Sequence, residues 1–278
     1  MSLDITKFNL PDTEYYKEES TKDTIYLHHT AGNYRPDWTI SGWERDRTKT
    51  GQRIRVSTSY VIGNRSIDGR DNSFDGKIYE AFSPNYWSYH LGLKSKNNTV
   101  LNKKSIGIEI CNFGELKRSS SGEFFTYTNT KIGPDQVIEL DTEFRSGKFF
   151  HKYTEAQIES VRKLIVELSK KFSIDIKKGL QASIKRRSAK IPSGISILEQ
   201  QRWLNMNGFT DSKGRRLVED GIPGPSTTEA LNKYRKGPFE IDEDALSGNP
   251  GIWTHANVRS DKNDCSPQPL LIEMINSL

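Results

Sequence analysis

Apolar positions along the first part of the chain follow a strand-like pattern. Four short runs are rich in β-branched or aromatic residues and are separated by polar stretches, which is typical of β-strands. They lie at residues 23–30, 55–62, 77–82 and 105–111. The stretch 64–76 is rich in glycine and aspartate, and it therefore predicts a long hairpin loop between the second and third strands.

The segment 113–151 predicts an insertion with its own hairpin, since the runs 124–127 and 136–140 favour strands. The strongest helical pattern follows, where Thr154–Gln157 has the sequence of a capping box. Apolar residues then recur at helical spacing: Ile158, Val161, Leu164, Ile165, Leu168 and Phe172. Strands followed by a helix with one apolar face indicate an α/β or α+β domain.

The pattern changes after Gly179. The basic run 185–190 predicts a solvated loop, and residues 197–209 predict a helix. A turn at 220–225 is followed by Ser226–Glu229, which reads as a second capping box that opens another helix. This helix–turn–helix unit of about 55 residues is a candidate small domain. A last short strand is predicted at 252–255, before a polar loop at 256–269.

Composition narrows the class of protein without choosing a function. The net charge is +5 and the pI is near 9.0, which favours a polyanionic partner such as nucleic acid or the acidic polymers of a bacterial wall. No nucleic-acid-binding motif is recognisable, so we expect no nucleic-acid partner. Two cysteines exclude a disulfide framework. No apolar run is long enough to cross a membrane, and residues 1–9 lack the pattern of a secretory signal.

Candidate chemistry centres on a few histidines and acidic groups. His28 and His255 stand at the ends of predicted strands, and Asp264 and Cys265 follow in the next loop. Two imidazoles with one anionic ligand, Cys or Asp, are what a zinc site with an open fourth position requires. Glu109 lies inside an apolar strand, where an unpaired charge is costly, and it could serve as a general base.

Five ordered segments carry a family resemblance. They are Ile25–Gly32, Val56–Ile62, Trp87–Gly92, Ser105–Glu109, and Thr254–His255 with Lys262–Cys265. Together they resemble the motifs of the N-acetylmuramoyl-L-alanine amidase type 2 family, which includes AmpD-like enzymes, phage lysozyme-type amidases and peptidoglycan-recognition proteins. The resemblance implies an α/β fold with a central mixed β-sheet flanked by helices. It also implies cleavage of the amide between N-acetylmuramic acid and L-alanine in peptidoglycan.

The resemblance assigns roles to individual residues. It makes His28 and His255 ligands of one Zn²⁺ ion per chain, Glu109 the general base, and Lys262 the residue that stabilises the oxyanion. The third ligand stays open between two neighbours. Its place after Lys262 points to Asp264, whereas its spacing from His255 points to Cys265, which is preferred because thiolate is the softer zinc donor.

The same resemblance places His90 and Tyr60 at the substrate groove. Ser59 stands where many relatives have histidine, and Thr58 stands where some phage enzymes have tyrosine. These departures leave the shape of the groove and the peptide preference open. His29 is expected to support the site or the fold rather than to bind metal.

Residues 197–231 resemble a three-helix peptidoglycan-binding domain. The chain is therefore expected to consist of a catalytic domain at 1–180 and 248–278, with a helical module at 181–247 inserted before the last strand. We expect a monomeric enzyme that acts in cell-wall lysis, for example as a phage endolysin. It would reach the wall through a holin or a secretion system, unless a signal is missing from this sequence. The alternative is a non-catalytic protein that recognises peptidoglycan.

Overall fold

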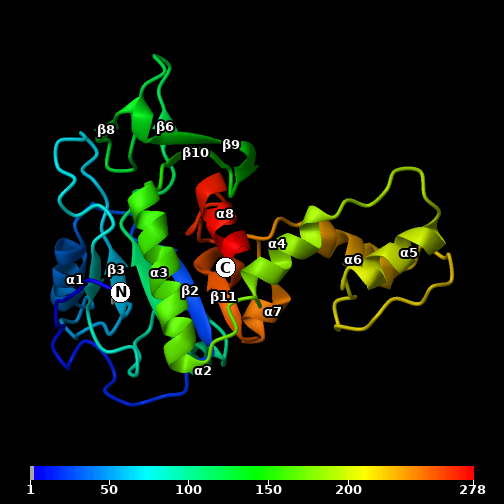
Figure 1. The fold of residues 1–278 in the computed structure, drawn as a ribbon, viewed down its shortest axis with the longest axis horizontal. Coiled ribbons are helices and arrows are strands. Elements are labelled where there is room, and N and C mark those ends of the chain that lie inside the picture. The colour runs from blue at the N-terminus through cyan, green and yellow to red at the C-terminus, as the bar shows by residue number, and fades with distance from the viewer. Residues whose placement is uncertain (1–2) are drawn as a thin grey trace.

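The computed structural model describes residues 3–278 and is built around a mixed β-sheet (Figure 1). Its six strands have the order β1-β4-β3-β5-β2-β11. Their bounds are β1 Ile5–Lys7, β2 Thr24–His29, β3 Tyr60–Ile62, β4 Ile78–Glu80, β5 Ser105–Ile110 and β11 Gly251–Thr254. All neighbouring pairs are parallel except β3 with β4. The predicted central mixed sheet flanked by helices is confirmed.

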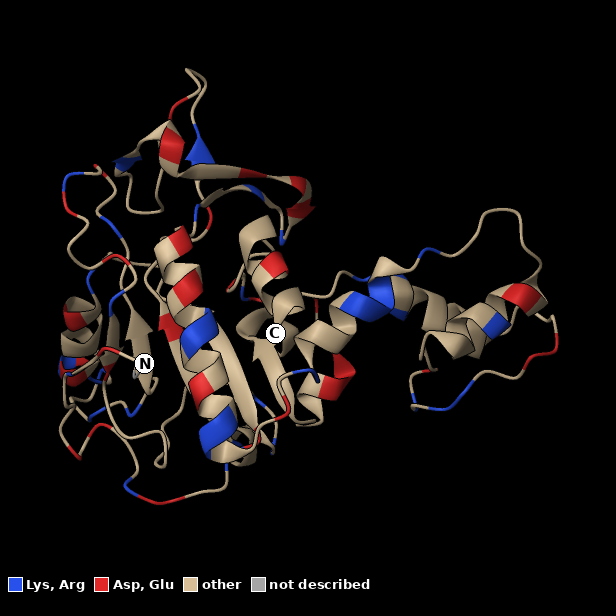
Figure 2. Cartoon of the chain, viewed as in Figure 1, with Lys and Arg blue, Asp and Glu red and all other residues tan. Residues whose placement is uncertain are grey.

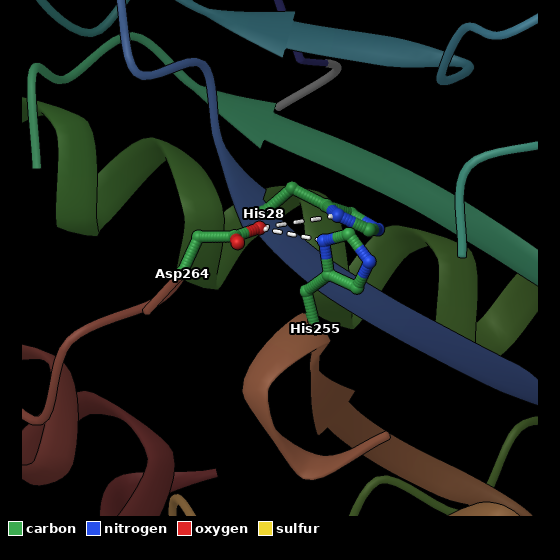
Figure 3. Close-up of side chains that lie close together, drawn as sticks. All are labelled: His28, His255 and Asp264. Atoms are coloured by element: carbon green, nitrogen blue, oxygen red, sulfur yellow. Dashed lines mark hydrogen bonds and ion pairs between the residues drawn. The ribbon is translucent and has the colours of Figure 1, made fainter. Parts of the chain in front are cut away.

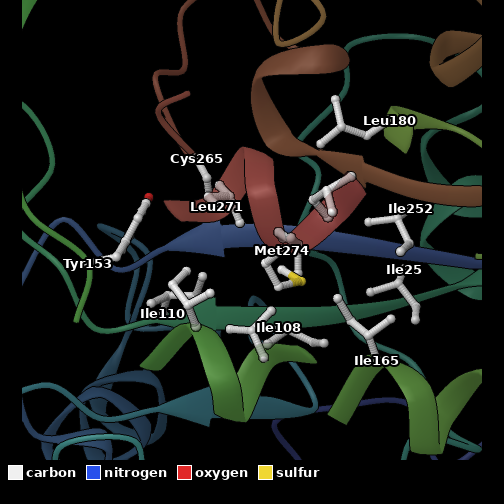
Figure 4. Packing of buried hydrophobic residues seen from close by; sticks show 14 of the residues in the cluster. Ile25, Ile108, Ile110, Tyr153, Ile165, Leu180, Ile252, Cys265, Leu271 and Met274 are labelled. Atoms are coloured by element: carbon white, nitrogen blue, oxygen red, sulfur yellow. The ribbon is translucent and has the colours of Figure 1, made fainter. Parts of the chain in front are cut away.

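One face of the sheet carries the main apolar core. The helices α3 (Glu155–Phe172) and α8 (Pro269–Ser277) cover this face, and isoleucines of β2, β5 and β11 pack beneath them (Figure 4). The predicted capping box of α3 is present, because Thr154 accepts from the backbone N–H of Gln157 and the Gln157 side chain accepts from that of Thr154. The sequence pattern did not predict α8.

The opposite face carries two smaller apolar clusters with a polar strip between them. On one side, Ile40 of α1 (Pro36–Arg45) packs on Val61 of β3. On the other side, Leu101 of α2 (Asn98–Lys104) packs with Tyr26 of β2 and with Trp253 of β11. The strand positions between these clusters include Glu109 and His28, so polar side chains of the central strands are gathered on this face.

The insertion at 113–151 is more elaborate than the predicted single hairpin. It forms two small sheets that lie above the ends of the central strands in Figure 1. The first contains β6 Lys117–Arg118, β7 Phe124–Phe125 and β8 Lys131–Ile132, and the second contains β9 Val137–Phe144 and β10 Gly147–His151, with a short 3-10 helix η1 at Pro134–Gln136. Arg145, at the turn between β9 and β10, donates to the carbonyls of Ala256 and Ser260.

The prediction of a solvated loop at 185–190 is wrong, because most of this run belongs to helix α4 (Leu180–Ser188). Figure 2 shows its basic residues as a band on the helix. Leu180 and Ile184 are buried in the main core on the other side of α4. The only apolar residue in the run 185–190 is a small alanine. The run by itself therefore does not show the amphipathic pattern that begins five residues earlier.

The segment after α4 forms a small helical unit that projects from the sheet domain (Figure 1). It contains α5 (Ile197–Met206) and α6 (Pro225–Arg235), and its own apolar cluster is built on Leu204, Phe209, Leu217 and Ala230. The short helix α7 (Glu243–Leu246) leads back to β11. The capping box predicted at Ser226–Glu229 is wrong: α6 starts one residue earlier, at Pro225, with Gly224 as an N-cap that has no side-chain bond.

Strand β3 is shorter than its predicted segment 55–62, since residues 55–59 form only an isolated bridge between Val56 and Tyr89. The predicted strands at 23–30, 77–82, 105–111 and 252–255 are confirmed to within a few residues, and 64–76 is a loop. Among residues 3–278, no helix combines the length and the apolar character needed to cross a bilayer.

Candidate metal centre and catalytic groups

The register of the central strands places the first two candidate residues side by side. His28 of β2 is the direct partner of Glu109 in β5. Neighbouring residues of paired strands project to the same face, so both side chains leave the sheet away from the main core. Val61 of β3 also pairs with Glu109 and lies on this face, where it belongs to the α1 cluster.

The return of the chain through β11 adds the other two residues. β11 pairs with β2 on the side away from β5, and it ends at Thr254, directly before His255. His255 opens a 3-10 helix, η2 (His255–Asn257), and the loop behind it folds back so that Ala256 N donates to Asp264 O at 2.8 Å. As a result, residues more than 220 positions apart in the sequence come into contact.

His28, His255 and Asp264 form a compact buried cluster (Figure 3). Their candidate ligand atoms all lie within 4.8 Å of one another. Asp264 Oδ2 is 3.0 Å from His255 Nδ1 and 3.3 Å from His28 Nδ1. Two imidazoles and a carboxylate are a zinc-type donor set, and the three side chains converge on one point as such a set requires.

The ring nitrogens of His28 and His255 that face away from Asp264 also have partners. His28 Nε2 lies 3.0 Å from His90 Nδ1, and His255 Nε2 lies 2.9 Å from the carbonyl oxygen of Leu91. Because a carbonyl only accepts, His255 carries a hydrogen on Nε2. Zinc-binding histidines are held in this way, with one nitrogen facing the metal and the other donating to the protein.

The electrostatics of the cluster suit a cation. Burial by itself raises the pKa of the Asp264 carboxyl, but the close contacts with the His255 and His28 rings hold that pKa well below its usual range. Burial, together with the neighbouring His255, lowers the pKa of His28 to about 4. At neutral pH, Asp264 is therefore a carboxylate and His28 a neutral imidazole, which are the states that bind metal ions.

Glu109 has the opposite character. Burial, reinforced by the negative charge of Asp264, raises the pKa of its carboxyl well above the usual value, while Lys262 opposes this effect. One of its oxygens, Oε2, is buried and has no hydrogen-bond partner among residues 3–278. A carboxyl that is raised in pKa and left without a partner beside a donor cluster is poised to exchange a proton.

The structure brings Asp264, rather than Cys265, to the two histidines. The Cys265 side chain is fully buried on the other side of the loop, beside Tyr153 and Leu271 in the main core (Figure 4). Burial raises the pKa of this thiol well above its usual value. A thiol in such apolar surroundings resists forming the thiolate that zinc binds.

The structure separates the two residues that were predicted to line the substrate groove. Tyr60 pairs with Ile108 and projects into the main core, on the opposite face from Glu109, where its hydroxyl donates to Glu80 at 3.1 Å. His90 does lie at the cluster, but both of its ring nitrogens are occupied, by His28 at 3.0 Å and by Ser105 Oγ at 2.9 Å. His29 projects to the same face as Tyr60 and lies 3.5 Å from the Tyr153 hydroxyl.

Sequence reasoning missed the residues behind the cluster. Leu91 contributes only a carbonyl, which no sequence pattern reveals. Asn102 is buried and binds the backbone at His90 and Leu91. In the sequence, the only feature that pointed to Asn102 is its place as an amide in the short polar run before the strand that contains Glu109.

A family model described as N-acetylmuramoyl-L-alanine amidase matches residues 18–192 of this chain. That segment is more than half of the 278 residues. It contains His28 and Glu109, whereas His255 and Asp264 lie beyond its end. The match therefore covers two of the four residues of the site, and the structure brings the other two next to them.

Several solved structures are distantly similar. A mutant endolysin from Bacillus subtilis shares 16% identity over 63% of this chain and 80% of that chain, with a TM-score of 0.37. AmiD from E. coli, in complex with anhydro-N-acetylmuramic acid-L-Ala-D-gamma-Glu-L-Lys, shares 17% identity over 71% and 63%, with a TM-score of 0.35. The Staphylococcus aureus hydrolase AmiA, in complex with its ligand, shares 10% identity over 99% and 83%, with a TM-score of 0.41. No curated protein matches the chain.

The raised pKa of Glu109 can be measured directly. In the metal-free chain, we expect its carboxyl to titrate well above 4.5 in ¹³C NMR, with the Glu109→Gln variant assigning the signal. Lys262→Met should raise this pKa further, because it removes a positive charge that favours the carboxylate, and Asp264→Asn should lower it. A Glu109 that titrates near 4.5 and responds to neither change would contradict this electrostatic description.

Proposed function

Since this chain belongs to the N-acetylmuramoyl-L-alanine amidase family, we propose that it is a zinc-dependent enzyme that cleaves the amide between N-acetylmuramic acid and L-alanine in peptidoglycan. The observation that carries the proposal is the buried cluster of His28, His255 and Asp264 with Glu109 beside it. The family match supports the peptidoglycan amidase activity, and the donor set supports the metal.

His28, His255 and Asp264 would hold the zinc ion, with Nδ1, Nδ1 and a carboxylate oxygen as ligands. Three protein ligands leave a fourth position for water or substrate. When bound there, zinc polarises a carbonyl and lowers the pKa of water, so that a nucleophile forms near neutral pH. In this proposal Asp264, and not Cys265, is the third zinc ligand, a choice that the sequence pattern left open.

Glu109 is the proposed general base. Its carboxyl lies beside His28, its Oε2 has no competing partner among the described residues, and its raised pKa matches a group that takes up a proton and returns it to the leaving amine. Lys262 is two residues before Asp264 on the same loop, and its charge already acts on Glu109. We assign it the stabilisation of the negative oxygen that develops on the attacked carbonyl.

We further propose that the helical module at 181–247 binds peptidoglycan through the unit that projects after α4, and that it holds the enzyme on the wall. Helices α5 and α6 share an apolar cluster of their own, and the unit projects from the sheet domain instead of covering it (Figure 1). Helix α4, at its start, packs into the main core and so anchors the projection. An enzyme with such a second contact to its polymeric substrate fits a role in wall degradation, such as that of an endolysin.

Zinc content tests the choice between the two neighbouring candidates for the third ligand. We expect purified protein to hold about one zinc per chain, and Asp264→Ala to hold almost none. Cys265→Ala should keep its zinc, although it loses stability because it empties a fully buried position. Metal analysis after dialysis measures both, and the reverse result would make Cys265 the ligand.

Hydrolysis tests the reaction itself. Wild-type protein should release peptides that begin with L-alanine from purified cell walls, as read by mass spectrometry. Glu109→Gln should lower kcat about 10²- to 10⁴-fold while zinc content stays unchanged, because only proton transfer is lost. Glu167→Gln, at an exposed position of α3, is the matched control and should be fully active. Absence of such peptides from the wild-type digest would refute the activity.

The wall-binding role can be tested by removing the projecting unit. Arg187 donates to the carbonyl of Lys236 at 2.8 Å, so the two ends of the unit lie side by side and a short Gly/Ser linker can replace residues 190–235. In the inactive Glu109→Gln background, this deletion should weaken binding to insoluble walls about 10- to 100-fold in a sedimentation assay. Equal binding with and without the unit would leave it a structural appendage.

A further inference from the structure

The two candidate metal-binding histidines are supported from behind by consecutive residues. His28 Nε2 meets the ring of His90 at 3.0 Å, and His255 Nε2 meets the carbonyl of Leu91 at 2.9 Å. His28 belongs to β2, whereas His255 directly follows β11 and opens η2. The dipeptide 90–91 therefore sets the orientation of both rings at once.

One buried side chain holds this dipeptide in place. Asn102 of α2 is 1% exposed, and its Oδ1 accepts from His90 N at 2.8 Å and from Leu91 N at 3.2 Å. Its Nδ2 donates to the carbonyl of Asn98 at 2.7 Å and to Asn98 Oδ1 at 3.0 Å. Both lone pairs and both hydrogens of the amide are used, so only this orientation of the side chain satisfies all of its neighbours.

The ring of His90 is also fixed on its remaining sides. Its Nε2 lies 2.9 Å from Ser105 Oγ, which itself donates to the carbonyl of Asn102 at 3.3 Å. Gly107 of β5 lies beneath the ring, and a Cβ atom there would stand 3.2 Å from His90 Cγ and 2.7 Å from a methyl of Thr58. The ring thus has little room to turn away from His28.

We propose that Asn102 is a positioning residue of the metal centre, acting through the backbone of His90 and Leu91 to orient His28 and His255. The inference rests on the zinc site of the proposed function. Asn102 itself touches neither histidine, and its effect is to keep the outward nitrogens paired so that the two Nδ1 atoms stay directed at the same point.

A purely structural role of Asn102 would lower stability without changing metal affinity, so zinc affinity is the decisive measurement. We expect Asn102→Ala to raise the zinc dissociation constant about 10- to 100-fold, measured by competition with a chromophoric chelator below the melting temperature. Asn64→Ala is the matched control. Asn64 is also fully buried, accepts from Arg65 N and donates to the carbonyl of Cys111, yet it contacts no member of the cluster.

Two more variants separate the proposed pathway from general damage. Asn102→Asp keeps the acceptor for His90 and Leu91, so it should keep zinc affinity within about threefold of wild type even where it melts earlier. His90→Phe keeps a ring but removes the partner of His28, so it should weaken zinc binding as well. Because both residues act on the same ring, the losses in Asn102→Ala and His90→Phe should combine to less than their product.

The orientation itself can be read by long-range ¹H–¹⁵N NMR of the histidine rings. In zinc-bound wild type, both His28 and His255 should carry hydrogen on Nε2, and Asn102→Ala should broaden or shift these signals. Unchanged zinc affinity in Asn102→Ala, or equal losses in Asn102→Ala and Asn64→Ala, overturns this inference and leaves the proposed function standing. A wild-type chain that binds no zinc overturns the metal centre and this inference together.

Discussion

The parallel pairing of β5, β2 and β11 is the constraint on which the site depends. Direct pairing places His28 opposite Glu109, and β11 on the other side of β2 ends where His255 begins. A shift of one residue in β2 would turn His28 toward the main core and bring His29 to the site instead. The isoleucines and leucine that alternate with these polar residues prevent such a shift, because they fill the core beneath α3 and α8.

The cost of burying charge explains which partners surround the polar side chains of the site. Asp264 is buried, and it is stable as a carboxylate because two imidazoles face it. Those imidazoles are in turn paired on their outward side with His90 and Leu91. Glu109 is the exception, with one buried oxygen that has no partner in the described part of the chain. An unsatisfied group of this kind is tolerated where function requires it.

Local patterns were sufficient to identify the buried strands of the sheet and the helix with the clearest apolar stripe. The β-branched runs identified β2, β4, β5 and β11, and the capping box with its apolar stripe identified α3. The same reasoning failed at α4, whose run of basic residues concealed the two apolar residues that pack into the main core. It also failed at the start of α6, where proline and not a capping serine begins the helix. At α4 the contact with the main core decided the structure, whereas at α6 the proline at the first helical position did.

The sequence by itself determined most strands of the sheet, the long helix α3, and the roles available to His28, Glu109 and His255, because strand alternation, helical spacing and family motifs are local properties. It could not choose between Asp264 and Cys265, which are adjacent in a loop that has no periodicity. Only the tertiary structure separates them. Asp264 lies at the two histidines, whereas the Cys265 thiol packs with Tyr153 and Leu271 in the main core. The carboxylate instead lies against the pair of histidines brought together by β2 and β11, where its charge is compensated.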